Sequence, residues 1–278
     1  MPILQEPRFA LNHMTAPKLG IDAFFALSAR LGLTEVEIRN DLAGNAILDG
    51  TKPETIRAAA QRHGQKILTI NALQRFNDWT PARAAEAEDL AGWCEATGAA
   101  ALILVPKNDG TGCADTERLV NLEQALAGLA PILARHGILG YIEPLGFEIC
   151  SLRRKSEAAA AIHALGLADR FRITHDTFHH HLAGEAAIFP DLTGLIHISG
   201  VTDPQVSVAD MRDAHRVLVD RDDRVGNVAQ IAQLLAAGVA APCSFEPFSP
   251  EVHESATLVA DVAGSMQFIR SALAALAA

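Results

Sequence analysis

Short apolar runs alternate with longer amphipathic segments along the whole 278-residue chain. The apolar runs have the length of β-strands. They cover residues 9–14, 35–40, 66–73, 101–107, 138–144, 171–177, 195–200 and 242–248. Between them, apolar residues recur every three or four positions, as in helices that bury one face. These segments cover residues 21–31, 53–63, 81–97, 116–136, 155–165, 227–237 and 253–277.

Capping residues support these helices. Thr51 stands two residues before Pro53 and Thr80 directly before Pro81, a combination of cap and early proline that is typical of helix starts. Glycine follows the predicted helix end at residues 32, 64, 98, 137 and 238, as in the common C-terminal cap. The interval between the sixth and seventh strands is short, so its helix must be short too. We expect it around residues 185–189.

Regular strand–helix alternation predicts a parallel sheet. Eight repeats favour a closed (β/α)₈ barrel, whose typical size of roughly 250 residues fits this chain. An open dinucleotide-binding sheet is disfavoured, because no G-x-G-x-x-G motif follows the first strand. No linker rich in Pro, Gly or Ser interrupts the pattern. We therefore expect residues 1–278 to form one α/β barrel domain.

Composition narrows the functional classes. Acidic residues outnumber basic ones by 33 to 23, giving a formal net charge of −10, which argues against nucleic acid as a partner. No apolar run has the length of a membrane span, and the N-terminus lacks a signal-peptide pattern, so we expect a cytoplasmic protein without membrane contact. The cysteines are Cys94, Cys113, Cys150 and Cys243, and no C-x-x-C pattern occurs among them, so we expect most of them to be reduced and packed as small hydrophobes.

Ionisable residues stand at the ends of four consecutive strands. They are Glu143, Asp176, His197 and Glu246. In a barrel of this type the C-terminal strand ends form one rim, where catalytic residues lie. Three carboxylates gathered there would repel one another unless a cation is bound. Oxygen ligands with one imidazole suit Mn²⁺, Mg²⁺, Co²⁺ or Zn²⁺, so we expect one divalent metal ion, with Mn²⁺ favoured.

Other polar residues are candidates for substrate binding. His179 lies just beyond the sixth strand, while His175 falls on the strand face opposite Asp176 and should pack under the helices. The pattern leaves the roles of His13, His180 and His181 open, although His181 is also a candidate for a substrate contact. The candidates for substrate contacts are Asn71, Lys107, His179, His181 and Arg224.

The chain resembles a known superfamily, the sugar isomerases and epimerases with a xylose-isomerase-like barrel. The resemblance runs along nearly the whole chain, and it is strongest for the inosose (2-keto-myo-inositol) isomerases of inositol catabolism. The segments that carry it include Phe9–Asn12, Glu35–Arg39, Asn71–Leu73, Asp176–His181, Asp223–Val225 and Phe245–Pro250.

The resemblance implies roles for these residues. Glu143, Asp176, His197 and Glu246 correspond to metal ligands, with Glu143 and Glu246 also acting as the acid/base pair. His179 and Arg224 correspond to substrate-binding residues. The implied reaction is isomerisation of a keto-sugar or inosose through an enediolate. A homodimer is left open.

Alternatives remain at this point. On the same fold, ketose 3-epimerases, hydroxypyruvate isomerases and inosose dehydratases share the initial proton abstraction. A phosphodiesterase of the endonuclease IV kind would need further metal ligands and a basic groove, and the net charge disfavours it. A non-catalytic sugar-binding barrel would lack some of the four ligands.

Overall fold

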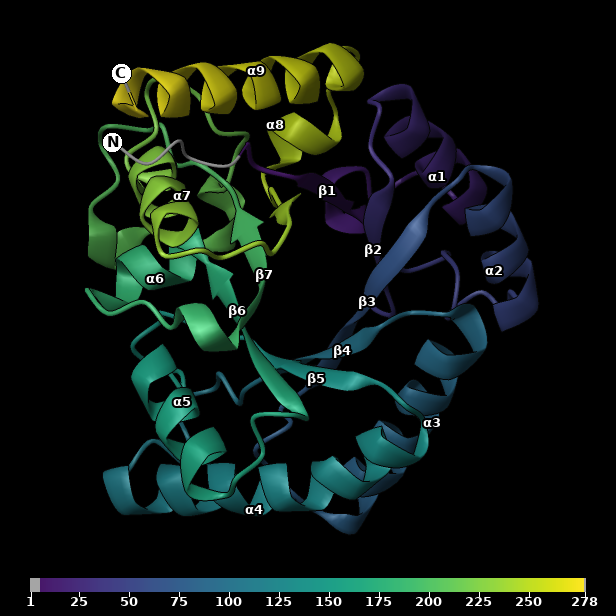
Figure 1. The fold of residues 1–278 in the computed structure, drawn as a ribbon, viewed down its shortest axis with the longest axis vertical. Helices are drawn as coiled ribbons and strands as arrows, with labels where there is room; N and C mark the ends of the chain where they lie inside the picture. Colours follow the sequence, from purple (N-terminus) through teal and green to yellow (C-terminus); the bar gives the residue numbers. More distant parts are fainter. Residues whose placement is uncertain (1–5, 278) are drawn as a thin grey trace.

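The computed structural model describes residues 6–277, and its strands close into a barrel in the order β1 to β8 (Figure 1). All neighbouring strands are parallel, and β1 pairs with β8 through Leu11 and Phe245 to complete the ring. The predicted (β/α)₈ fold is confirmed. The strands are β1 Phe9–Asn12, β2 Glu35–Arg39, β3 Lys66–Gln74, β4 Ala101–Val105, β5 Leu139–Ile142, β6 Phe171–Asp176, β7 Thr193–Ile198 and β8 Cys243–Phe245.

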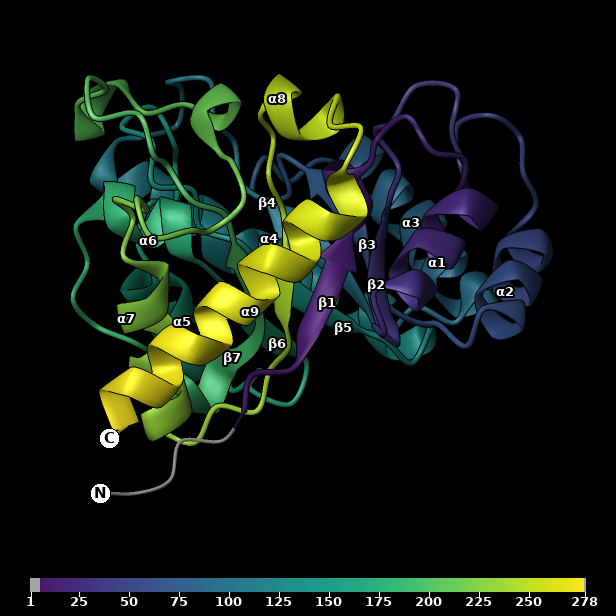
Figure 2. The same ribbon diagram turned by 90° about the horizontal axis from the view of Figure 1, so that it is seen from above.

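Helices surround the barrel, and the strands in side view point toward the end where α8 lies (Figure 2). The α-helices are α1 Ile21–Arg30, α2 Pro53–Arg62, α3 Pro81–Thr97, α4 Asp115–Arg135, α5 Lys155–Ala164, α6 Thr177–Ala183, α7 Asn227–Ala236, α8 Pro250–His253 and α9 Leu258–Ala277. Most begin or end within about two residues of the pattern-based prediction, as expected for helix boundaries. The expected final helix is divided, with α8 and α9 separated by a short turn.

Two of the three buried apolar clusters of the core limit where polar side chains can lie in the barrel. The larger apolar cluster fills the space between the strands and the helices. A smaller cluster of Ala10, Leu68, Ala72, Ile103 and Leu195 fills part of the barrel interior. Buried polar residues occupy other interior positions, so the inside of the barrel is only partly apolar.

The expected sixth helix around residues 185–189 is wrong. The helix α6 begins directly at the end of β6, because the Asp176 side chain caps it by accepting a 2.9 Å hydrogen bond from the His179 backbone N–H. Gly184, with φ of 62°, ends it. Glu185 has another function: its carboxylate accepts hydrogen bonds from the backbone N–H groups of Lys155 and Ser156 at the start of α5.

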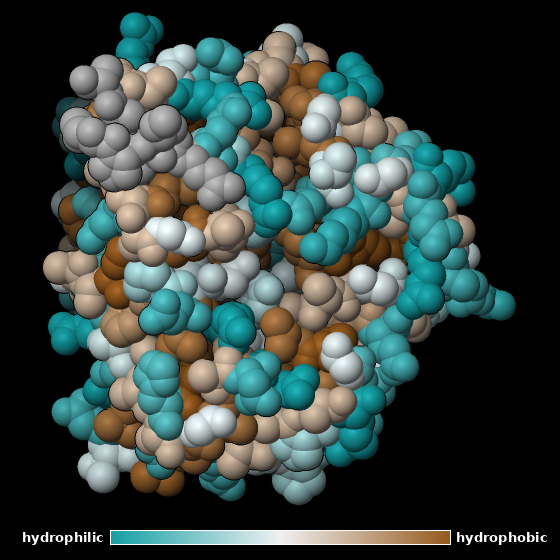
Figure 3. Space-filling view, in the orientation of Figure 1, coloured by the Kyte–Doolittle hydropathy of each residue, from teal (hydrophilic) through white to brown (hydrophobic). Residues whose placement is uncertain are grey.

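The helices bury their apolar faces against the barrel, so their polar faces form much of the outer surface. Figure 3 shows hydrophilic residues along the periphery over α2, with patches of hydrophobic residues elsewhere on this face. None of the described helices combines the length and apolar character that crossing a membrane requires. All four cysteines are unpaired, and only Cys113 is not buried.

Candidate metal centre

Four side chains from consecutive strand ends converge at the C-terminal end of the barrel. Asp176 ends β6, His197 lies in β7, and Glu143 and Glu246 follow β5 and β8. Each offers one ligand atom, and these four atoms lie within 4.8 Å of one another. Nδ1 of His197 is 2.7 Å from Glu143, 3.2 Å from Glu246 and 3.9 Å from Asp176. The structure thus brings together all four residues that the sequence singled out as ligands.

The donor set fits a divalent cation. All four residues are buried, and isolated carboxylates are costly to desolvate. Arg216 contacts both Asp176 and Glu246, and Arg39 contacts Glu246. Glu143 has no such arginine: within residues 6–277 its side chain hydrogen-bonds only to His197. Three carboxylates and one imidazole would hold the ion, and Glu143 is the ligand whose charge most needs it.

The electrostatics of the ligands differ. Burial raises the pKa of Glu143 above its ordinary value, and nearby Glu246 adds to this. Burial would also raise the pKa of Glu246, but His197, Arg216 and Arg39 outweigh it and hold this pKa well below its usual range. For Asp176, the Arg216 guanidinium likewise outweighs burial and lowers the pKa. The two glutamates therefore sit in opposite environments.

Metal binding should weaken as the pH falls. Burial alone would lower the pKa of His197, but Glu246, Glu37 and Glu143 outweigh it and hold the pKa well above its ordinary value. A raised pKa keeps a proton on the imidazole to higher pH, and that proton competes with a metal for Nδ1. We expect the apparent Zn²⁺ affinity to drop by about tenfold per pH unit below this pKa. Titrations with a competing chelator at several pH values will test this, and a pH-independent affinity would contradict it.

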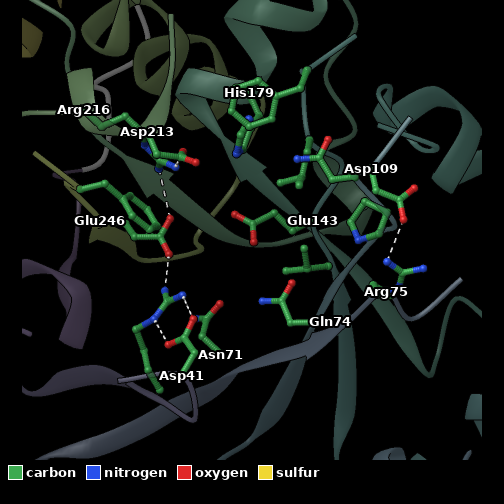
Figure 4. A pocket seen from close by; sticks show the side chains of 17 residues that line it. Asp41, Asn71, Gln74, Arg75, Asp109, Glu143, His179, Asp213, Arg216 and Glu246 are labelled. Carbon is green, nitrogen blue, oxygen red and sulfur yellow. Dashed lines mark hydrogen bonds and ion pairs between the residues drawn. The ribbon is translucent and has the colours of Figure 1, made fainter. Parts of the chain in front are cut away.

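A cavity of about 430 Å³ opens above the ligands (Figure 4). Glu143 and Glu246 point into it, with Asn71 and Gln74 on one side and His179 on the other. Phe248 and Phe147 supply part of the apolar wall. The predicted substrate residues Asn71 and His179 therefore lie at the cavity.

Three predicted substrate residues do not line this cavity. Arg224 is directed elsewhere, because its guanidinium donates to the backbone oxygens of Asp203 and Val206. Lys107 lies 3.7 Å from the Asp78 carboxylate. His181 is half-buried on α6, outside the cavity lining. All three residues follow a strand end, but their side chains lie outside the cavity lining. Closeness to a strand end in the sequence therefore does not predict which side chains reach the cavity.

The arginine at the site is Arg216, which the sequence analysis missed. Its guanidinium is 2.7 Å from Asp176 and 3.1 Å from Glu246, and it lies 4.6 Å from the Phe248 ring centre. A signal was present, because the loop after β7 holds two Arg-Val pairs, one at Arg216 and one at Arg224. Only the tertiary fold distinguishes them.

The strand β2 contributes two further residues that the sequence analysis missed. Glu37 and Arg39 are both buried inside the barrel, with Arg39 2.8 Å from Glu246. The alternation of side chains along β2 could have identified them. Val36 and Ile38 pack in the apolar cluster between the strands and the helices, so Glu37 and Arg39, on the other face of the strand, must point into the barrel.

Gly146 holds α6 and His179 against the cavity. A β-carbon at this position would lie 2.3 Å from the His179 carbonyl oxygen and 2.6 Å from Cβ of Leu182. Gly146→Ala must therefore displace α6. Because His179 would contact the substrate, we expect a raised KM with a smaller loss of kcat, and metal content close to wild type because Asp176 belongs to β6.

Gly20→Ala is a matched control for this change. Gly20 has an ordinary φ of −64°, and an added β-carbon there would meet nothing within 4 Å. Steady-state kinetics with the metal-loaded variants should show wild-type values for Gly20→Ala. A wild-type KM for Gly146→Ala would contradict the role given to α6.

Fold and site together define a (β/α)₈ barrel whose C-terminal rim carries a buried carboxylate–imidazole group that could hold a metal ion. The chain belongs to the xylose isomerase-like TIM barrel family, whose model matches residues 25–272. A comparison with curated protein sequences finds no significant match.

Solved structures of similar fold cover almost the whole chain. A xylose isomerase domain containing protein from Salmonella typhimurium LT2 is 31% identical over 100% of both chains, with a TM-score of 0.85. IolI protein with a bound zinc atom is 18% identical over 97% of both chains, with a TM-score of 0.80. D-psicose 3-epimerase with D-tagatose from Clostridium cellulolyticum H10 is 14% identical, covering 96% of this chain and 99% of its own, with a TM-score of 0.72.

Proposed function

We propose that this protein is a divalent-metal-dependent isomerase or epimerase of an uncharged keto-sugar or keto-cyclitol, with an inosose as the first substrate to test. The observation that carries the proposal is the pair Glu143 and Glu246, two buried glutamates that belong to the metal-ligand group and face the same cavity. A family of xylose isomerase-like barrels, a zinc-bound IolI neighbour and a D-psicose 3-epimerase neighbour support it.

The charges around the cavity favour a neutral substrate. Each arginine that lines it is already paired with carboxylates. Arg39 is 2.6 Å from Asp41, and Arg216 is 2.7 Å from Asp176. At the rim, Arg75 is 2.8 Å from Asp109. A phosphate or carboxylate on the substrate would have to displace one of these pairs, whereas hydroxyl groups can share their donors and acceptors.

The chemistry divides between the ion and the protein. When bound, the divalent ion supplies Lewis-acid polarisation of a substrate carbonyl, which acidifies the neighbouring C–H. Glu143 is placed to accept that proton: its Oε1 contacts His197, while among the described residues its Oε2 has no hydrogen-bond partner. The C–H electron pair then moves toward the carbonyl oxygen, and the substrate becomes an enediolate.

The fate of that proton defines the product. Return to the adjacent carbon, which was the carbonyl carbon, completes an isomerisation when the hydroxyl proton also moves from one substrate oxygen to the other. Return to the same carbon from the opposite face completes an epimerisation. Loss of a β-hydroxyl instead would be a dehydration. Glu246 lies across the cavity from Glu143 and is the candidate for proton return (Figure 4). His179 lines the same cavity and would bind a substrate hydroxyl.

A substrate panel tests the proposal. The metal-loaded protein is incubated separately with inososes, ketohexoses, hydroxypyruvate and a ketose phosphate, and the products are identified by NMR. We expect turnover of a neutral inosose or ketohexose and little turnover of the ketose phosphate. Turnover of the phosphate compound alone would contradict the neutral-substrate assignment, and the product from a neutral compound identifies the reaction type.

A further inference from the structure

Glu37 is a fully buried carboxylate inside the barrel, on the side of His197 away from the ligand group. Both of its oxygens lie 3.1 Å from Nε2 of His197. We propose that Glu37 is a positioning residue that fixes the His197 ring, so that Nδ1 is presented to the metal. This inference rests on the metal centre of the proposed function. Glu37 is not itself one of the four ligand candidates.

The two ring nitrogens of His197 have separate partners. Nδ1 faces Glu143 and Glu246, at 2.7 and 3.2 Å, while Nε2 faces only Glu37 among the carboxylates of the described chain. A neutral imidazole has one N–H donor and one acceptor nitrogen. Because a carboxylate can only accept, Glu37 places the hydrogen on Nε2 and leaves the Nδ1 lone pair for a cation.

Glu37 is itself held in place from three other strands. Thr69 and Asn71 of β3 donate to Oε2 at 2.7 and 2.9 Å. Ser244 of β8 donates to Oε1 at 2.5 Å, and Asn12 of β1 at 3.2 Å. All four partners donate through a hydroxyl or an amide N–H, so they suit an ionised carboxylate that accepts at every site. This network fixes Glu37 independently of His197.

The same network reaches a ligand directly. The Asn12 amide donates to Glu37 and also to Glu246, at 3.2 Å in each case. One carboxylate outside the ligand group is therefore connected to two members of that group, His197 and Glu246. Partners of this kind orient metal ligands and raise their basicity, and their loss typically weakens metal affinity by about 10–100-fold.

The test compares Glu37→Gln with Glu35→Gln. Glu35 is two residues earlier in β2 and pairs with Arg8 and Lys66, away from His197. Zn²⁺ affinity is measured by competition with a chromophoric chelator, and thermal unfolding reports stability. We expect Glu37→Gln to weaken Zn²⁺ binding by at least about tenfold, because a neutral amide replaces a charge-assisted partner. Glu35→Gln should bind Zn²⁺ as the wild type does.

A second measurement reports on the ring itself. In ¹⁵N-histidine-labelled, Zn²⁺-saturated protein, the His197 signals are assigned by their loss in His197→Gln. We expect an Nε2–H that is protected from exchange in the wild type and in Glu35→Gln, and exposed to faster exchange in Glu37→Gln. Ser244→Ala removes one donor to Glu37 but keeps the carboxylate, so it provides a milder variant with the ring still held.

The outcomes separate this inference from the proposed function. Lower stability of Glu37→Gln with unchanged Zn²⁺ affinity and Nε2–H exchange would reduce Glu37 to a structural role and overturn the inference, while leaving the isomerase proposal intact. Wild-type protein that binds Zn²⁺ but converts no keto compound would overturn the isomerase proposal alone. Wild-type protein that binds no metal would overturn both.

Discussion

Glu143→Gln and Glu246→Gln are each expected to lower turnover by at least about 100-fold, even with metal in excess, since a positioned general base typically contributes 10²–10⁴-fold. Glutamine keeps the size of the side chain, and its amide oxygen can still coordinate weakly. It cannot accept the substrate proton at neutral pH. Steady-state rates at saturating metal measure the effect. Glu35→Gln is the control, because Glu35 lies at the start of β2, away from the ligand group.

The two glutamine variants should differ in deuterium exchange. Among residues 6–277, one carboxylate oxygen of Glu143 has no hydrogen-bond partner, whereas both Glu246 oxygens accept hydrogen bonds, one from Arg39 and one from Arg216. We therefore expect Glu143→Gln to stop exchange of the substrate α-hydrogen, while Glu246→Gln retains some exchange without forming product. Normal exchange and turnover in both variants would refute the two-glutamate mechanism and make His179 the better candidate for the base.

Asp176→Ala is expected to remove the metal and with it all measurable activity. Asp176 is a ligand candidate and also the partner of Arg216, so its loss leaves a buried guanidinium with one contact fewer. Elemental analysis of protein prepared without chelators should find near-stoichiometric metal in the wild type and little in the variant. Full metal content together with full activity would show that the ligand set is wrong.

Asp176→Asn distinguishes the effect of Asp176 on metal binding from its effect on stability. The Asp176 side chain also caps α6 through the His179 backbone N–H, and asparagine is as good a cap as aspartate. We expect Asp176→Asn to melt closer to the wild type than Asp176→Ala, yet to bind metal far more weakly. Circular dichroism melts and metal titrations on both variants distinguish loss of the helix cap from loss of the ligand.

The sequence was sufficient for the barrel and for the four ligand candidates. Strand–helix alternation and glycine caps are local signals, and residues at strand ends share one rim once the barrel is closed. Glu143 and Glu246 could therefore be placed together although they lie on different strands. The misplaced sixth helix has a local cause: Asp176 is both a ligand candidate at the end of β6 and the N-cap that starts α6, so no loop separates the strand from the helix.

The rest of the site depends on contacts that no local pattern contains. Arg216 reaches Asp176 from a long loop, 40 residues away along the chain, and an equivalent Arg-Val pair at Arg224 turns toward the backbone of that loop. Glu37 meets His197 across the barrel, at a sequence separation of 160 residues. Strand alternation could place Glu37 and Arg39 inside the barrel, but only the closed sheet shows which residues they meet.

The most direct test of the central claim is proton exchange on the substrate. Metal-loaded protein is incubated with an inosose or a ketohexose in D₂O, and the carbon next to the carbonyl is followed by NMR, with metal-depleted protein and the Glu143→Gln variant in parallel. We predict deuterium at that carbon with the metal-loaded wild type, and none above background in the two controls. Stoichiometrically metal-bound protein that exchanges no α-hydrogen of any neutral keto-sugar or inosose would contradict the account.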